Sequence, residues 1–249
     1  MPQLYDKNQL IENPASFQQW QITAFHEFAE KLTNKDHPFP CIPAVIGCRL
    51  GHLRYAFCED PRKSKSREML ASALKTFREH SRIYGNYTSL IVFFENHEDL
   101  LETYTIREYE TLFWSLLMDV CKYDLKNWPE HIPEDPMHHV WEYCFEEEQY
   151  FVYCATPCHI KRKSRHSPFM TLAITPRWVL NIFNSESLAA DKIKMKIRER
   201  LAEYDSIPAH PDLNLYGSDD NFEWKQYFLR DDQSSAPICP FAHLHKAKN

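Results

Sequence analysis

The sequence has only four glycines among its 249 residues. Dinucleotide-binding fingerprints and phosphate-binding P-loops need several glycines at short fixed spacings, because the backbone must pass close to a phosphate group. The glycines of this chain are Gly47, Gly51, Gly85 and Gly217, and they match neither spacing. Nucleotide-loop enzymes of these types are therefore excluded.

Long apolar runs and a basic charge excess are also absent. No apolar run approaches the roughly 18 residues that a helix needs to cross a bilayer, and residues 1–6 lack the basic and apolar regions of a signal peptide. The formal net charge of −6 argues against nonspecific binding of nucleic acid, which needs a basic face. We therefore expect a soluble, cytoplasmic protein that interacts with neither membranes nor nucleic acid.

The eight cysteines do not form the pairs with two intervening residues that are typical of zinc knuckles and redox motifs. A structural zinc site is therefore not expected. Without a secretion signal, most of these thiols are expected to be reduced and to pack as small buried hydrophobes.

The pattern of apolar residues predicts one α+β domain over residues 1–249, with a largely antiparallel or mixed sheet packed by about four helices. Apolar residues recur at helical spacing over 17–32, 67–84, 98–123 and 186–204. Aromatic and β-branched runs predict strands over 53–58, 89–94, 139–145, 150–155, 169–175 and 224–229. The segment 145–149 is typical of a hairpin turn, so the two strands that flank it should be antiparallel neighbours.

The segment from Thr156 to His166 carries the densest chemistry, and it follows a predicted strand directly. A loop that leaves a strand can hold a binding residue on a rigid scaffold. His159 could ligate iron or zinc, and the guanidiniums of Arg162 and Arg165 suit carboxylates or phosphates. Together they would suit haem, with one imidazole on the metal and the guanidiniums on the propionates. A solvated basic turn is the alternative interpretation.

Two cysteines lie next to prolines near opposite ends of the chain, in Phe39-Pro40-Cys41 and in Cys239-Pro240-Phe241. Each segment could be a packed corner in which proline restricts the backbone. The alternative is that Cys41 or Cys239 is a thiolate ligand for haem.

Acidic residues follow or precede predicted strands at two places. Glu59 and Asp60 follow one strand, and Asp220 and Glu223 precede another. Such residues are usually solvated, but a pocket for a cationic substrate would need carboxylates.

Several segments, in this order, resemble the YqcI/YcgG family, which includes haem-dependent guanidine N-hydroxylases. The resemblance spans most of the chain. The segments are Phe39-Pro40-Cys41, Leu53 to Phe57, Thr156 to Arg165, Thr175-Pro176-Arg177, Glu223 to Tyr227 and Cys239-Pro240-Phe241.

The resemblance implies a haem b enzyme that uses dioxygen and electrons to hydroxylate a guanidine or amine nitrogen of a small arginine-like substrate. His159 would be the axial iron ligand, with Cys41 and Cys239 as alternatives, and Arg162 and Arg165 would bind the propionates. The candidates for the grip on a guanidinium are Glu59, Asp60, Asp220 and Glu223. Such an enzyme also needs an electron donor as a partner. Its oligomeric state could be a homodimer.

Two other functions stay open at this point. The same loop and aromatic core could carry or sense haem without turning over a substrate. A haem-free metal enzyme could instead use His159 with the pair His138-His139 and a carboxylate, although no ordered metal motif is present.

Overall fold

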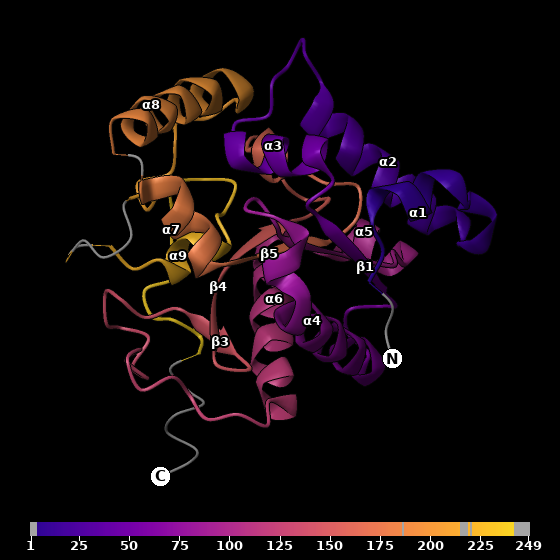
Figure 1. Cartoon of the computed structure of the whole chain (residues 1–249), viewed down its shortest axis with the longest axis horizontal. Coiled ribbons are helices and arrows are strands. Elements are labelled where there is room, and N and C mark those ends of the chain that lie inside the picture. Colours follow the sequence, from indigo (N-terminus) through magenta and orange to yellow (C-terminus); the bar gives the residue numbers. More distant parts are fainter. Residues whose placement is uncertain (1–3, 186, 215–218, 220, 242–249) are drawn as a thin grey trace.

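A five-stranded mixed sheet lies at the centre of the computed structural model, which describes residues 4–185, 187–214, 219 and 221–241 (Figure 1). The strands are β1 (Arg54–Cys58), β2 (Leu90–Phe94), β3 (Tyr143–Phe145), β4 (Glu148–Ala155) and β5 (Thr171–Pro176). Their order across the sheet is β1-β2-β5-β4-β3. The pair β1 and β2 is parallel, and the other pairs are antiparallel. The predicted α+β class with a mixed sheet is confirmed.

Helices cover the sheet on both sides, so alternate strand residues enter different cores. On one side, α4 (Ser64–Tyr84) and α6 (Ile106–Val120) pack on Val92, Val152 and Leu172. On the other side, α2 (Gln19–Thr33) and α3 (Ile42–Leu50) pack on Tyr55, Phe57, Ile91 and Phe93. Figure 1 shows these two helix pairs on opposite sides of the sheet, which we call the α4/α6 face and the α2/α3 face.

The remaining helices are short or lie at the periphery: α1 (Lys7–Glu12), α5 (Glu98–Thr103), α7 (Arg177–Ser185), α8 (Ser187–Tyr204) and α9 (Trp224–Tyr227). The helices predicted over 17–32 and 67–84 are confirmed as α2 and α4, and α8 accounts for the one predicted over 186–204, apart from residue 186, which lies outside the described residues. The short helices α1, α3 and α7 were not predicted.

The helix predicted over 98–123 is divided into α5 and α6. Thr105 has extended backbone and begins α6 with a capping box, in which its side chain accepts from the Glu108 amide and the Glu108 carboxylate accepts from the Thr105 amide. The apolar periodicity continues across this break, so it did not indicate where one helix ends and the next begins.

The strand predicted over 224–229 is wrong, because residues 224–227 form the helical turn α9. Trp224 and Tyr227 are both buried in the core on the α4/α6 face. A spacing of three residues places both rings on the same side of a helical turn, whereas a strand would point them to opposite faces.

The predicted hairpin is confirmed by β3 and β4. Its two turn residues, Glu146 and Glu147, have φ of 51° and 63°. Positive φ at both central positions matches the right-handed twist of the flanking strands. The sequence pattern therefore located this turn although neither position is a glycine.

No helix among the described residues is both long enough and apolar enough to span a bilayer. This agrees with the absence of long apolar runs in the sequence.

Gly47 lies within α3, where the helix passes close to the loop that precedes β2. A Cβ at this position would be 2.3 Å from the backbone carbonyl oxygen of Tyr87. An exposed glycine-to-alanine change inside a helix usually stabilises it. Here we expect Gly47→Ala to lower the free energy of unfolding by about 1–3 kcal/mol instead, because backbone atoms must move.

Urea denaturation of the wild type and two variants measures this effect. Gly51→Asn is the control, since Gly51 has φ of 70° and open space around it, and asparagine tolerates that backbone. A stability of Gly47→Ala equal to or above that of the wild type would contradict the close approach of α3.

Candidate functional site

The loop of residues 156–166 is closed on itself by backbone contacts. The amide of Thr156 donates to the carbonyl of Arg165 at 3.1 Å, and the amide of Ser167 donates to the carbonyl of Thr156 at 3.2 Å. The loop therefore leaves β4 and returns toward β5 as a compact unit, and its side chains project from a rigid base.

His159 is buried in this loop, and both of its ring nitrogens are occupied. Nε2 lies 2.8 Å from the carbonyl oxygen of Leu229, and Nδ1 lies 2.8 Å from the hydroxyl of Thr156. Because a carbonyl only accepts, Nε2 carries the proton and Nδ1 accepts from Thr156. Burial lowers the pKa of His159 to about 4. The imidazole is therefore neutral at pH 7, and it could ligate iron only after losing one of these bonds.

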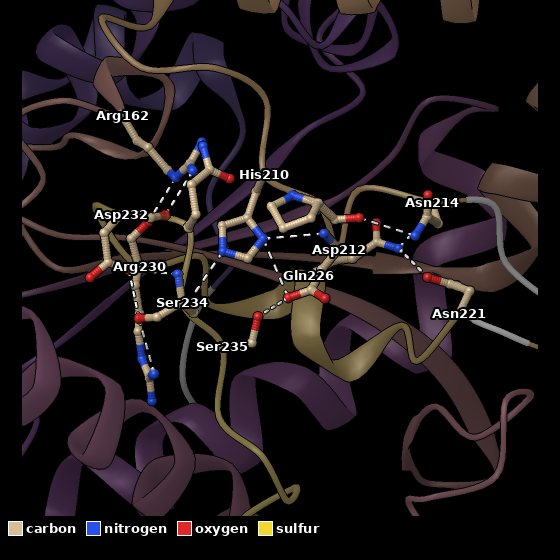
Figure 2. A network of polar contacts seen from close by, with 12 residues as sticks. Arg162, His210, Asp212, Asn214, Asn221, Gln226, Arg230, Asp232, Ser234 and Ser235 are labelled. Carbon is tan, nitrogen blue, oxygen red and sulfur yellow. Dashed lines mark hydrogen bonds and ion pairs between the residues drawn. The ribbon is translucent and has the colours of Figure 1, made fainter.

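Arg162 is almost completely buried, and its guanidinium donates to three backbone carbonyls. The acceptors are the carbonyl oxygens of Arg230 at 2.7 Å, Asp232 at 2.8 Å and Pro208 at 3.1 Å. Figure 2 shows Arg162 within a wider polar network that also includes His210 and Ser234. In this arrangement the guanidinium binds the protein's own backbone.

Arg165 is used in the same way. Its guanidinium donates to the carbonyl oxygens of Tyr227 at 2.9 Å and Gln226 at 2.8 Å, and it lies over the ring of Tyr153, 4.3 Å from the centroid. Burial lowers the pKa of this guanidinium. His159, Arg162 and Arg165 are therefore buried and bonded to the protein, although Ile160, Lys161 and Lys163 of the same loop are exposed. The interpretation as a solvated basic turn does not apply to these three buried residues. The assignments of His159 to iron and of the two arginines to propionates stay predictions.

The carboxylates predicted to bind a guanidinium bind cations of the chain itself. Asp60 accepts two hydrogen bonds from Arg62, at 2.9 Å from Nε and 2.7 Å from Nη2, and Glu59 pairs with Lys65. Burial acts to raise the pKa of Asp60, but the hydrogen bonds from Arg62 lower it overall. The Lys65 hydrogen bond lowers the pKa of Glu59.

Glu223 does bind a guanidinium, namely that of Arg177. Glu142 is completely buried and accepts from Nε of the same arginine at 2.7 Å. Burial, together with the nearby Glu142, raises the pKa of Glu223 well above its usual range. One arginine thus joins two carboxylates in the interior. Asp220 lies outside the described residues.

The two candidate cysteines lie on opposite faces of the sheet. Cys239 is fully buried in the core on the α4/α6 face. Cys41 precedes α3 and lines a pocket on the α2/α3 face. Burial within the surrounding protein raises the pKa of its thiol, although the residue keeps exposed surface. The two thiols therefore cannot serve one shared site.

That pocket is the cavity best suited to an apolar ligand among the described residues. It holds about 910 Å³ of space free of protein atoms, part of it open to solvent. Its floor is formed by β5 and β4, where Phe151 faces the pocket, and Phe28 and Phe39 stand at its sides. Thr171, Ala173 and Thr175 of β5 face it, whereas Leu172 and Ile174 face the other core. Small side chains on one face of β5 thus make the space.

Three polar groups stand at the mouth of this pocket: Glu27, Cys41 and His166, all of which keep exposed surface. The Nδ1 atom of His166 lies 2.9 Å from the carbonyl oxygen of His159. This contact makes Nδ1 the protonated nitrogen and leaves the lone pair on Nε2. Glu27 and His166 were not singled out from the sequence. The alternation of small and large residues in β5 was the signal in the sequence for a pocket on this face.

The separate metal-enzyme hypothesis gains no geometric support. The rings of His138 and His139 stack on each other, and His139 faces Asp219 at 3.7 Å. Across the described parts of the chain, no group of three or more histidine, cysteine or acidic residues is placed to hold a metal ion.

Comparisons with known proteins agree with the resemblance. The model of the YqcI/YcgG family matches residues 28–242. Two proteins of Bacillus subtilis (strain 168) are each 44% identical: YqcI over 98% of this chain and 96% of its own length, and YcgG over 99% and 97%. A Streptomyces lavendulae protein named "Putative N(omega)-hydroxy-L-arginine synthase DcsA" is 29% identical over 89% of this chain and 84% of its own length. No solved structure matches the chain significantly.

The depressed pKa of His159 predicts a pH dependence of stability. The folded protein keeps this imidazole neutral down to about pH 4, whereas the unfolded chain takes up the proton near pH 6.5. Stability from this group is therefore complete above pH 6.5 and is lost as the pH falls from 6.5 toward 4. Between pH 6.5 and 4.5 the wild type should lose about 2 kcal/mol more than His159→Gln, which does not titrate.

Urea titrations of both proteins at several pH values measure this difference. Glutamine is chosen because its amide can still donate to the Leu229 carbonyl. An equal loss in the two proteins would show that His159 is not held neutral in the fold.

Proposed function

This chain belongs to the YqcI/YcgG family, and on that premise we propose that it is a haem-dependent monooxygenase that hydroxylates a guanidine nitrogen of a small arginine-like substrate. The relative from Streptomyces supplies the reaction class by its name. The observation that carries the haem part of the proposal is the apolar, aromatic-walled pocket on the α2/α3 face.

Several features of the pocket support haem as its ligand. Phe28, Phe39 and Phe151 offer apolar contacts for a flat macrocycle and exclude water. His166 offers Nε2 as a ligand, because its Nδ1–H donates to a backbone carbonyl. A second partner that orients the imidazole in this way is typical of metal-bound histidines. Cys41 is the alternative ligand at the same mouth.

We propose that the iron ligand comes from this mouth and that the loop of His159, Arg162 and Arg165 supports the wall behind it. The carbonyl of His159 holds His166, and the carbonyls of residues 163, 164 and 166 accept from the Lys31 ammonium at 3.0, 3.1 and 2.5 Å. The loop would then act on the haem through the residues that it positions.

The reaction inserts one oxygen atom of dioxygen into an N–H bond of the guanidine. The second oxygen atom leaves as water, which consumes two protons and two electrons from an external donor. When bound, haem supplies the dioxygen and electron chemistry. The chain's part is to hold the target nitrogen in a fixed orientation and to keep bulk water out of the pocket.

We expect the purified protein, supplied with haem, to bind one haem per chain, and His166→Ala to weaken haem binding by more than about 10-fold. Changes to groups that merely orient a ligand already cost that much. Haem titration and the ferrous carbonyl spectrum of each variant measure this. His37→Ala is the control histidine, because His37 is exposed in the connection between α2 and α3 and does not line the pocket.

Cys41→Ala and His159→Gln complete the series. Loss of haem in Cys41→Ala, with a wild-type Soret band far to the red in the ferrous carbonyl complex, would assign a cysteinate. Loss in His159→Gln alone would assign His159 and require that the loop opens. A wild type that binds no haem would overturn the cofactor proposal.

We also expect reduced, haem-loaded protein to add one oxygen atom to L-arginine or a simpler guanidine in the presence of dioxygen. Mass spectrometry of the products, with oxygen-18 gas as the label, measures the addition. Anaerobic and haem-free samples are the controls. Haem that binds and cycles normally with every guanidine unchanged would favour a haem carrier or sensor.

A further inference from the structure

We propose that Glu27 determines the specificity of the pocket for a cationic substrate, by accepting two hydrogen bonds from its guanidinium. The inference rests on the proposed function for the identity of the substrate. It assigns the binding of the substrate's positive charge to Glu27, which lies outside the motifs identified in the sequence.

Glu27 lies at the mouth of the pocket. It lies on α2, one residue before Phe28 and four before Lys31, and all three line the pocket. Glu27 also keeps exposed surface, which places its carboxylate at the solvent end of the cavity. Of the described residues that line the pocket, Glu27 is the one carboxylate.

The carboxylates that the sequence suggested for a guanidinium, apart from Asp220 outside the described residues, are already paired. Asp60 is paired with Arg62, Glu59 with Lys65 and Glu223 with Arg177. Opening any of these pairs would leave a cation of the protein without its partner, which is costly when the pair is buried. Glu27 forms no ion pair within the described parts of the chain.

Several other polar side chains that line the pocket are bonded to the protein itself. Lys31 follows Glu27 by one helical turn and could have paired with it. Its ammonium instead donates to three backbone carbonyls, those of residues 163, 164 and 166. Ser89 pairs with Thr175 at 2.7 Å, and Ser167 pairs with Thr171 at 3.0 Å. These side chains are thus bonded to the protein, and the Glu27 carboxylate remains available to a ligand.

A guanidinium suits this carboxylate better than an ammonium does. Two parallel N–H bonds fit the two oxygens of a carboxylate and fix the plane of the guanidinium. The third nitrogen then points away from Glu27, toward the interior of the pocket. A neutral urea of the same shape would gain much less, because the charge contribution is missing. Glu27 would therefore select charge and also orient the nitrogen to be hydroxylated.

The test compares L-arginine with L-citrulline, which replaces the guanidinium by a neutral urea. Isothermal titration calorimetry of the haem-loaded protein gives the Kd of each ligand for the wild type, Glu27→Gln and Glu30→Gln. Glu30 is the matched control, since it is exposed on the same helix but does not line the pocket. We expect Glu27→Gln to weaken arginine binding by about 10- to 100-fold, citrulline binding to stay unchanged, and Glu30→Gln to bind like the wild type.

Turnover of arginine, measured in parallel, separates this inference from the proposed function. Arginine binding that depends on Glu27 without any hydroxylation would support the site and overturn the reaction. Hydroxylation by the wild type with unchanged binding and selectivity in Glu27→Gln would overturn the role of Glu27 and leave the reaction standing. Failure of the wild type to bind arginine would overturn the inference. Thermal unfolding of each variant verifies that the fold is intact.

Discussion

The bonding of backbone carbonyls by buried basic side chains is the interaction on which the region around the pocket depends. His159, Arg162 and Arg165 donate to carbonyls between residues 226 and 232, and the Asp231 carboxylate accepts from the amides of residues 160–162 in return. Two irregular segments are thereby joined by side chains instead of a strand ladder. Buried carbonyls without such donors would each be costly. We call this set of contacts between residues 159–165 and 226–232 the carbonyl clamp. It stabilises an irregular, buried region beside the pocket.

The carbonyl clamp helps to keep the pocket open on the α2/α3 face of the sheet. Beside the strands that α2 and α3 cover, β5 presents Thr171 and Ala173 to the pocket. Leu172 and Ile174 on its other face fill the main core. A space lined by small side chains collapses unless rigid elements border it. The loop of residues 156–166, tied to α2 through Lys31, provides one such border.

The distribution of charge follows the same logic. The chain has more acidic than basic residues. Even so, Asp60 and Glu223, which the sequence suggested as guanidinium-binding residues, form ion pairs within the protein. Arg177 holds Glu142 and Glu223 in the interior, and Asp60 is held by Arg62. Glu27, by contrast, lies at an exposed helix position beside an apolar pocket and forms no ion pair within the described residues.

The amino-acid sequence by itself determined the class of the fold, because apolar periodicity and turn residues are local signals that survive without tertiary contacts. It located the core of the sheet and the hairpin at Glu146 and Glu147. It could not show that Arg162 and Arg165 are buried against carbonyls, since a basic residue looks the same in sequence whether it binds a ligand or its own backbone. It misassigned Trp224 to Tyr227, because a run rich in aromatic residues favours a strand by composition, whereas both rings pack into one core from a helical turn. Only the tertiary structure decided which polar side chains are left without a hydrogen-bond or ion-pair partner, because such partners lie far apart in the sequence.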